Sequence, residues 1–494
     1  MCVRRARRDD HRPRRFRPWI LRVVTTATLT AVFTQTSTAR GDEVDVTLPS
    51  RLVSSDQTPA SVATVTLRKF PYPYRAMLSI ASDADGLTLS KFMLIHRYLN
   101  TDEHTLLGKG LGLDIADSYF FFIGTDRPGF CDSYGTRWAD QMSYFSRLST
   151  TDLHNAKAIQ VFVHGGWIDS LHSLGDFSMQ NEKNTRFARR FAVTAVNEMK
   201  VNRLALDIWI NHGNRSNVGN FGDPESTYQK GDLSESKYYV SDLMVPAGIH
   251  FIWTRRDSDF GRKAMLYPIV LRDGRRVWGF YRFTDDGYSD KGQVLWNWSP
   301  LKLGEQLSAV HLQELEKSGS YSIIAQHLGG DAAKLPFYGD NLEGLVRLMR
   351  EYRAGRLLVT RTSRLLHYEL AQRFLQYSVD VKGGRVGIHA REIADPVLGH
   401  HVPTLAELRG ITFYTAHPAR TDLYIGNTLV APTETVRNPR DQTGSASIGV
   451  RWWPAQTGDL THVLPEKLQM PSHRTGPPTP MPRVWQEDSS WGSN

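Results

Sequence analysis

The pattern that most constrains the fold lies between residues 70 and 362, where short, continuously apolar runs alternate with loops and amphipathic stretches. Apolar runs of this kind are typical of strands buried on both faces, as in parallel sheets. The eight runs are Ala76–Ala81, Ser118–Ile123, Ala158–Val163, Leu204–Ile210, Ile249–Trp253, Val277–Phe283, Tyr321–Ala325 and Leu357–Val359. Helical periodicity between them marks Leu89–Tyr98, Thr185–Lys200, Glu305–Glu316 and Leu342–Tyr352. This alternation predicts an α/β fold, either a (β/α) barrel, regular or irregular, or a doubly wound open sheet, with the barrel preferred.

The pattern changes after the stretch 363–378, which predicts a final helix. Short β-prone segments follow at Arg385–His389, Gly410–Tyr414, Thr421–Ile425 and Ser447–Trp453. We therefore expect a barrel domain over 70–379 and a small β domain over 380–462. The last stretch, 463–494, is rich in proline and is predicted to be a disordered tail.

The first 40 residues carry most of the positive charge of the chain. Ten arginines stand there against two aspartates, a net of +8, so about +1 of the total of +9 remains for the other residues. An Arg-rich stretch, the moderately apolar run Val23–Phe33 and small residues at Ser37 and Ala39 together indicate a signal peptide over 1–39. An N-terminal extension over 40–69 would follow it. We therefore expect an exported protein that is periplasmic, on the cell surface or extracellular.

Charge and hydropathy also exclude some partners. The nearly neutral remainder argues against nucleic-acid binding, which needs a basic surface. The apolar run of the leader is far shorter than the roughly 20 residues that span a bilayer. No later apolar run reaches that length, so we expect no membrane span in the mature chain.

Acidic and histidine residues gather where the predicted strands end. Asp83 and Asp85 follow the first strand beside Gly86, and His172 and Asp176 follow the third. His164, His212 and His327 stand after the third, fourth and seventh strands. Because the active sites of such barrels form at the carboxyl ends of the strands, these side chains are predicted to share one rim. A single such residue is more often structural than functional, and Asp beside Gly is also common in turns.

Three of these positions resemble the motifs of the polysaccharide deacetylase (NodB-homology) superfamily. Ser82–Gly86 resembles its first motif, Thr-Phe-Asp-Asp-Gly, and His172–Asp176 resembles its His-Ser/Thr-x-x-His motif with Asp in place of the last His. Ala325–His327 resembles its late Leu-x-His motif. The resemblance covers about 70–380, and it includes the aromatic run 118–124 and the closing strand and helix at 357–368.

The resemblance implies a metal-dependent hydrolase that removes acetyl groups from a polysaccharide or glycan. It implies Asp85, His172 and Asp176 as ligands of one divalent ion, Asp83 as general base and His327 as general acid. We place His172 and Asp176 on one face of a helical turn, four residues apart. Zinc is the first choice of metal, and replacing a histidine by a carboxylate makes manganese or cobalt more plausible.

The sequence also departs from the family pattern. The two carboxylates at 83 and 85 are separated by Ala84, so on an extended segment their side chains should point differently. No Arg-x-Pro-Tyr motif is present to hold substrate. We take His212 and Arg215 as candidates for that role. Together with His164 and Trp167, an aromatic ring beside the ligands, they form the predicted substrate-binding set.

Three other functions remain open on the sequence alone. A glycoside hydrolase can use paired carboxylates without a metal, and barrels joined to a β domain are common among such enzymes. A glycosyltransferase can use Asp-x-Asp to hold a nucleotide-sugar, although the downstream histidines argue against it. A non-catalytic carbohydrate-binding relative is also consistent with the altered first motif.

Overall fold

The computed structural model describes residues 65–465, except 125–135, 178–181, 214, 255–259, 289–293, 297–301, 330–336 and 338. The predicted signal peptide, residues 40–64 of the predicted extension and residues 466–494 of the predicted tail lie outside this part of the chain. Among the helices of the described residues, none is both long and apolar enough to cross a membrane.

The centre of the fold is a curled nine-stranded sheet with the order β11-β12-β10-β9-β7-β5-β2-β15, in which β16 also pairs with β2. All the pairings are parallel except that of β11 with β12. The strands are β2 (Ala76–Ser82), β5 (Ala116–Tyr119), β7 (Ile168–His172), β9 (Ile208–Ile210), β10 (Phe251–Trp253), β11 (Leu266–Val270), β12 (Arg276–Phe280), β15 (Tyr321–Gln326) and β16 (Leu357–Val359). An isolated bridge joins Phe283, after β12, to Ile324 in β15. The α/β class and the curled sheet agree with the sequence, whereas a closed (β/α) barrel stays a prediction.

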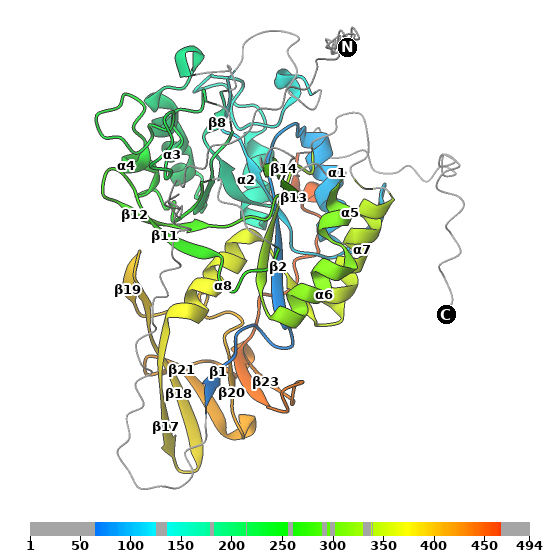
Figure 1. Cartoon of the computed structure of the whole chain (residues 1–494). Coiled ribbons are helices and arrows are strands. Elements are labelled where there is room, and N and C mark those ends of the chain that lie inside the picture. The colour runs from blue at the N-terminus through cyan, green and yellow to red at the C-terminus, as the bar shows by residue number, and fades with distance from the viewer. Residues whose placement is uncertain are drawn as a thin grey trace, which may run out of the picture. The chain divides into compact units, whose positions relative to one another are not determined.

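Each face of this sheet belongs to a different hydrophobic cluster. In β2, Leu78 and Ile80 pack in one cluster, and Met77 and Ala81 pack in the other, as the alternation of side chains along a strand requires. Figure 1 shows several helices of the cluster that contains Leu78 and Ile80 on one side of β2. Helix α8, which belongs to the other cluster, lies on the opposite side of β2. The helices are α1 (Leu89–Asn100), α2 (Ala156–Gly165), α3 (Arg189–Val201), α4 (Ser241–Met244), α5 (Leu303–Gln306), α6 (Ala309–Ser318), α7 (Asp340–Arg353) and α8 (Thr362–Phe374).

The predicted third strand is wrong. Residues 158–163 lie in α2, and the strand that takes the third place is β7, ten residues later in the chain. Ile159 and Phe162 of this run are buried at helical spacing, and Gly166 ends the helix with a positive φ of 78°. A short apolar run does not distinguish a buried helix from a strand. Because the third strand is β7 and not 158–163, His172 lies at the end of a strand of the central sheet.

The C-terminal region forms two further sheets. One has five strands, with the order β17-β18-β21-β22 and β19 on β18, and the other has the order β1-β20-β24-β23. Their strands are β1 (Thr66–Leu67), β17 (Leu375–Lys382), β18 (Arg385–Asp395), β19 (Gly399–His401), β20 (Thr412–Tyr414), β21 (Thr421–Ile425), β22 (Thr428–Leu429), β23 (Thr435–Asn438) and β24 (Ser447–Val450). Helix α8 ends at Phe374, earlier than predicted, because the chain becomes extended at Leu375. A strand from before the central sheet, β1, completes the second of these sheets. The remaining short strands are β3 (His104–Thr105), β4 (Gly108–Lys109), β6 (Phe122–Ile123), β8 (Gly175–Asp176), β13 (Asp285–Tyr288) and β14 (Val294–Trp296).

Carboxylates near the amino ends of the sheet strands hold α8 in place. Asp169 Oδ2 accepts a hydrogen bond of 2.8 Å from the backbone N–H of Ser363 in the first turn of α8. Asp207 pairs with His367 of the same helix. Because an anion is favoured where backbone N–H groups are free, these contacts fix the start of α8 against the sheet.

Asp169 should make the stability of the fold depend on pH. Burial raises the pKa of Asp169 to about 6, although the N–H of Ser363 and the charge of Arg361 oppose the shift. A folded-state pKa above the unfolded value stabilises the fold at low pH, and this contribution is lost as pH rises through about 6. At each pH we compare the free energy of unfolding of Asp169→Asn with that of the wild type. We expect this difference to shift in favour of the variant by about 1–3 kcal/mol between pH 4 and pH 7. Urea unfolding at both pH values measures the difference. An unchanged difference between the two proteins would contradict this expectation.

Candidate metal centre

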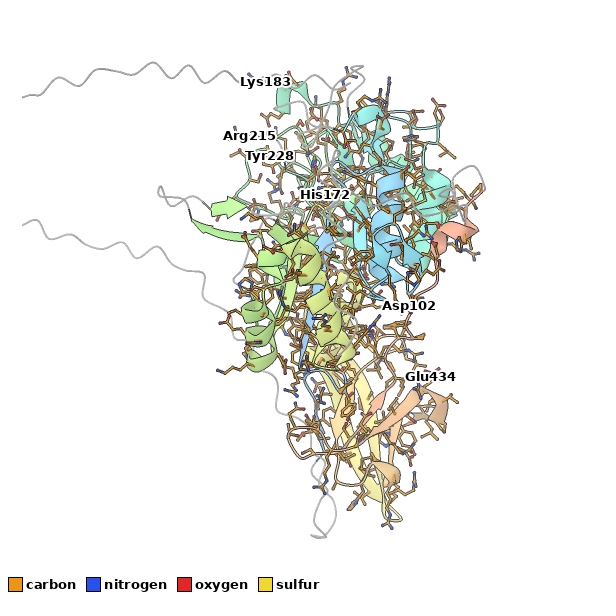
Figure 2. All side chains as sticks on the ribbon, turned by 90° about the vertical axis from the view of Figure 1, so that its right-hand side faces the viewer. Asp102, His172, Lys183, Arg215, Tyr228 and Glu434 are labelled. Atoms are coloured by element: carbon orange, nitrogen blue, oxygen red, sulfur yellow. The ribbon has the colours of Figure 1, made fainter. Side chains whose placement is uncertain are left out.

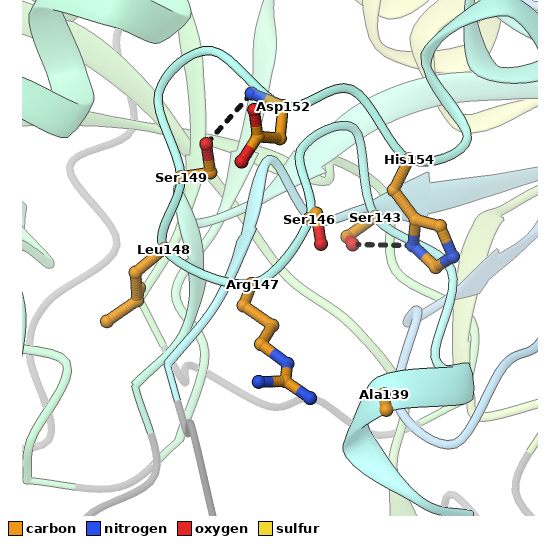
Figure 3. Close-up of a pocket in the computed structure, with 8 residues that line it drawn as sticks. All are labelled: Ala139, Ser143, Ser146, Arg147, Leu148, Ser149, Asp152 and His154. Atoms are coloured by element: carbon orange, nitrogen blue, oxygen red, sulfur yellow. Dashed lines mark hydrogen bonds between the residues drawn. The ribbon is translucent and has the colours of Figure 1, made fainter.

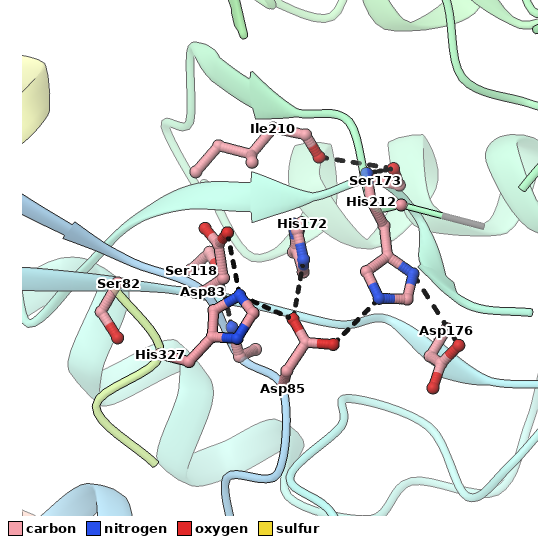
Figure 4. A network of polar contacts seen from close by, with 12 residues as sticks. Ser82, Asp83, Asp85, Ser118, His172, Ser173, Asp176, Ile210, His212 and His327 are labelled. Carbon is pink, nitrogen blue, oxygen red and sulfur yellow. Dashed lines mark hydrogen bonds and ion pairs between the residues drawn. The ribbon is translucent and has the colours of Figure 1, made fainter. Parts of the chain in front are cut away.

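The polar residues of the site lie where the strands of the central sheet end. Asp83 and Asp85 follow β2, and His172 is the last residue of β7. His212 stands two residues after β9, and His327 stands one residue after β15. Figure 4 shows their side chains turned toward one another. The sequence prediction that distant segments meet at one rim describes this arrangement.

Asp85 joins two histidines. Its Oδ2 lies 2.9 Å from His172 Nε2, and its Oδ1 lies 2.9 Å from His212 Nε2. The two imidazole rings are 4.6 Å apart at an angle of 72°. One donor atom from each of the three residues lies within 4.8 Å of the other two. Two imidazole nitrogens and one carboxylate are a donor set that suits zinc or another first-row transition metal and leaves positions open for water and substrate.

Asp176 lies outside this donor set, in contrast to the sequence prediction. Its Oδ1 is 3.8 Å from Nδ1 of His212, the nitrogen that faces away from Asp85. The expected helical turn is absent, because Asp176 belongs to β8 (Gly175–Asp176), which pairs with β6 (Phe122–Ile123). His212, which the sequence suggested as a substrate contact, takes the third position. Asp176 therefore lies on the far side of the His212 ring from Asp85, where it can orient that ring.

Asp83 lies beside the donor set and is held by a buried arginine. Arg282 Nη2 donates to Asp83 Oδ2 at 3.0 Å and to the carbonyl of Ala81 at 3.1 Å. The guanidinium of Arg282 lies 4.5 Å from the ring centre of Trp253. His327 Nε2 is 3.4 Å from Asp83 Oδ2 and 3.7 Å from Asp85 Oδ2. Asp83 Oδ1 is buried and has no hydrogen-bond partner among the described residues.

The charges of the site control its ionisation. Burial raises the pKa of Asp83, but Arg282 and the nearby histidines outweigh it and hold that pKa below its usual range. Burial likewise opposes ionisation of Asp85, and His212, His327 and His172 lower its pKa. Burial lowers the pKa of His212, but Asp85 reverses the effect and raises it to about 9. Both carboxylates are therefore ionised at neutral pH.

Local backbone contacts allow two carboxylates that are separated by Ala84 to face one site. The N–H of Ala84 donates to Ser118 Oγ at 3.0 Å, and its carbonyl accepts from Gln141. Gly86 then turns the chain with a φ of 68°, a value that glycine adopts without strain. As a result, both carboxylates reach His327, although their spacing predicts different directions on an extended segment.

The other predicted substrate contacts do not join this cluster. His164 lies in the last turn of α2, and its Nε2 contacts the carbonyl of Asn202 at 3.1 Å. Trp167 is 2% exposed and stacks on Phe162 at 5.5 Å, so it belongs to the core. Arg215 is exposed, three residues beyond His212, and is labelled with His172 in Figure 2.

Sequence reasoning missed Arg282, which supplies the charge nearest to Asp83. A single arginine inside the apolar run Val277–Phe283 was the available signal, because a cation in a buried strand needs an anionic partner. It also missed Asn217, whose Nδ2 lies 2.8 Å from His212 Nδ1. Asn217 comes from an irregular segment, where no periodicity indicates which way a side chain points.

Comparison with models of known protein families and with curated protein sequences found no match for this chain. The functional conclusion therefore depends on the geometry of the cluster and on the motifs in the sequence.

Proposed function

We propose that this protein is a metal-dependent hydrolase that removes acetyl groups from a polysaccharide or glycan, and that its curled sheet is a divergent (β/α) barrel. The observation that carries the proposal is the convergence of Asp85, His172 and His212 on one point, beside Asp83 and His327. Metal-assisted hydrolysis of an acyl bond uses protein ligands that hold an ion, together with a base and an acid. Asp83 supplies a carboxylate for the base, and His327 supplies an imidazole for the acid. The resemblance of the three sequence motifs to deacetylases supports the same reaction.

The residues divide into holding and proton-transferring groups. Asp85, His172 and His212 would hold the ion, which supplies a Lewis acid for the acyl carbonyl and lowers the pKa of a water. Asp83 would take the proton of the attacking water at Oδ1, while Arg282 and His327 fix its Oδ2. His327, whose Nε2 faces the cluster, would protonate the leaving amine or alcohol. The apolar ring of Phe120 packs 5.2 Å from that of His172, and such apolar surroundings would strengthen these charge interactions.

Release of acetate from acetylated glycans tests this proposal. We expect turnover with zinc, manganese or cobalt and none after a chelator, whereas a metal-free glycoside hydrolase would continue and would release reducing sugar ends instead. Asp83→Asn should lower kcat by about 10²–10⁴-fold while the metal content stays unchanged. A metal-loaded protein that shows no turnover on N- and O-acetylated glycans would favour the non-catalytic binding role.

The position of Asp176 gives a separate prediction. If it orients His212 from behind, Asp176→Asn should weaken metal binding by about 10–100-fold without abolishing it. If Asp176 were itself a ligand, the same variant would lose the ion as completely as a variant of His172. Competition against a fluorescent zinc chelator measures both affinities. Equal losses in the two variants would restore Asp176 to the ligand set.

A further inference from the structure

A polar cavity of about 560 Å³ lies between residues 139 and 154. Hydroxyl groups and three ionisable side chains line it, with Ser143, Ser146, Arg147, Asp152 and His154 on its walls. Figure 3 shows these side chains around the hollow. The lining offers many hydrogen-bonding groups and little apolar surface, a composition that suits a hydroxylated ligand better than an apolar one.

The backbone connects this cavity to the metal centre. The N–H of Ile123 in β6 donates to the carbonyl of Arg147 at 3.0 Å, and the same residue pairs with Asp176 of β8. Neighbouring strands are about 5 Å apart, so the Arg147 backbone lies about 10 Å from that of Asp176. Asp176 contacts His212. A separation of this order is comparable to the length of a short oligosaccharide, so we take the two places as parts of one polymer-binding site.

Arg147 is the unusual residue of this cavity. Its φ of 55° lies in the left-handed region, which non-glycine residues rarely adopt. The side chain is exposed, and no hydrogen bond or ion pair of its guanidinium occurs among the described residues. Strained backbone that directs a side chain into a cavity is a feature of binding sites. An unpaired guanidinium offers a fork of N–H donors that matches a carboxylate.

We propose that this cavity binds an acidic sugar unit, a hexuronate, of the polymer whose acetylated unit lies at the metal centre. The proposal rests on the function proposed above and names the substrate class of the same site. Arg147 binds the sugar carboxylate through two parallel hydrogen bonds. Ser146 and Asp152 hydrogen-bond the sugar hydroxyl groups, which fixes the ring, and the charge of Arg147 selects against neutral polymers.

Binding without turnover tests this proposal independently of hydrolysis. Isothermal titration calorimetry would use the chelator-treated full chain with oligogalacturonate and, separately, with neutral malto-oligosaccharide of equal length. The wild type should bind oligogalacturonate and should not bind the neutral oligomer. Arg147→Asn, which keeps a residue that tolerates a positive φ, should weaken binding by about tenfold or more, and Arg147→Lys should weaken it less.

Arg203 provides a matched control for these variants. It is also an exposed arginine with a positive φ, 52°, but it follows α3 and does not line the cavity. Arg203→Asn should leave the affinity unchanged. Equal weakening by both variants, equal binding of charged and neutral oligomers, or no binding of oligogalacturonate would each overturn the proposal. If the wild type binds oligogalacturonate but the metal-loaded protein releases no acetate from acetylated glycans, only the hydrolase function would be contradicted.

Discussion

Replacing His212 by alanine should remove the bound metal and reduce acetate release to background. The residue supplies one of three donor atoms, and its Nε2 lies 2.9 Å from Asp85 Oδ1. Loss of one of three ligands leaves two, which hold a divalent ion weakly in competition with water. We expect about one ion per wild-type chain and almost none in the variant after dialysis. Elemental analysis of the purified proteins measures this content.

Two variants make that result specific. His172→Ala should lose the metal to the same extent, because its Nε2 is the same distance from the other Asp85 oxygen. Arg215→Ala, an exposed neighbour in sequence, should keep it. A His212→Ala protein that retains a full equivalent of metal would show that the ligand set is a different one. Circular dichroism of each variant would separate a lost ligand from a lost fold.

Replacing Arg282 by methionine should lower the free energy of unfolding by about 3–5 kcal/mol. The side chain is 0% exposed, and its guanidinium donates a hydrogen bond of 3.0 Å to Asp83 Oδ2. Removing it leaves a buried carboxylate without its main counter-charge, while methionine fills much of the same volume. Urea denaturation of the wild type and the variant at pH 7 measures the change.

A double-mutant cycle identifies the cause of this loss. Asp83→Asn combined with Arg282→Met should be more stable than Arg282→Met alone, because the unpaired charge is gone. Arg189→Met removes an ion pair with Asp242 that is partly exposed on both sides, and it should cost only about 0–1 kcal/mol. Equal losses in the Arg282 and Arg189 variants would mean that burial of the pair has little energetic importance.

Much of the fold could be predicted from apolar patterning. The run Leu357–Val359 and the segment Thr421–Ile425 form strands with the predicted bounds, β16 and β21. The run 158–163 failed because it is short and apolar on most sides, so its period is ambiguous between a buried helix and a strand. The partnership of β1 with β20 could not be predicted, since pairing across more than 300 residues leaves no local signal.

The candidate site was predictable to the extent that it depends on strand ends. Asp83, Asp85 and His327 meet because each follows a parallel strand that the sequence pattern indicates. His172 ends β7, a strand that the pattern placed ten residues too early. The choice between Asp176 and His212 was not predictable. It depends on whether the chain after His172 turns as a helix or continues as β8, and the left-handed φ of 51° at Ser173 decides this.

The most direct measurement is the anomalous diffraction of a crystal of the full chain soaked with zinc. We predict one strong peak within bonding distance, about 2 Å, of Asp85, His172 Nε2 and His212 Nε2. Asp176 should lie beyond that distance, on the far side of the His212 ring. A crystal with no peak between these three side chains, or with the ion on Asp176 and away from His212, would contradict the metal centre and the hydrolysis proposed for it.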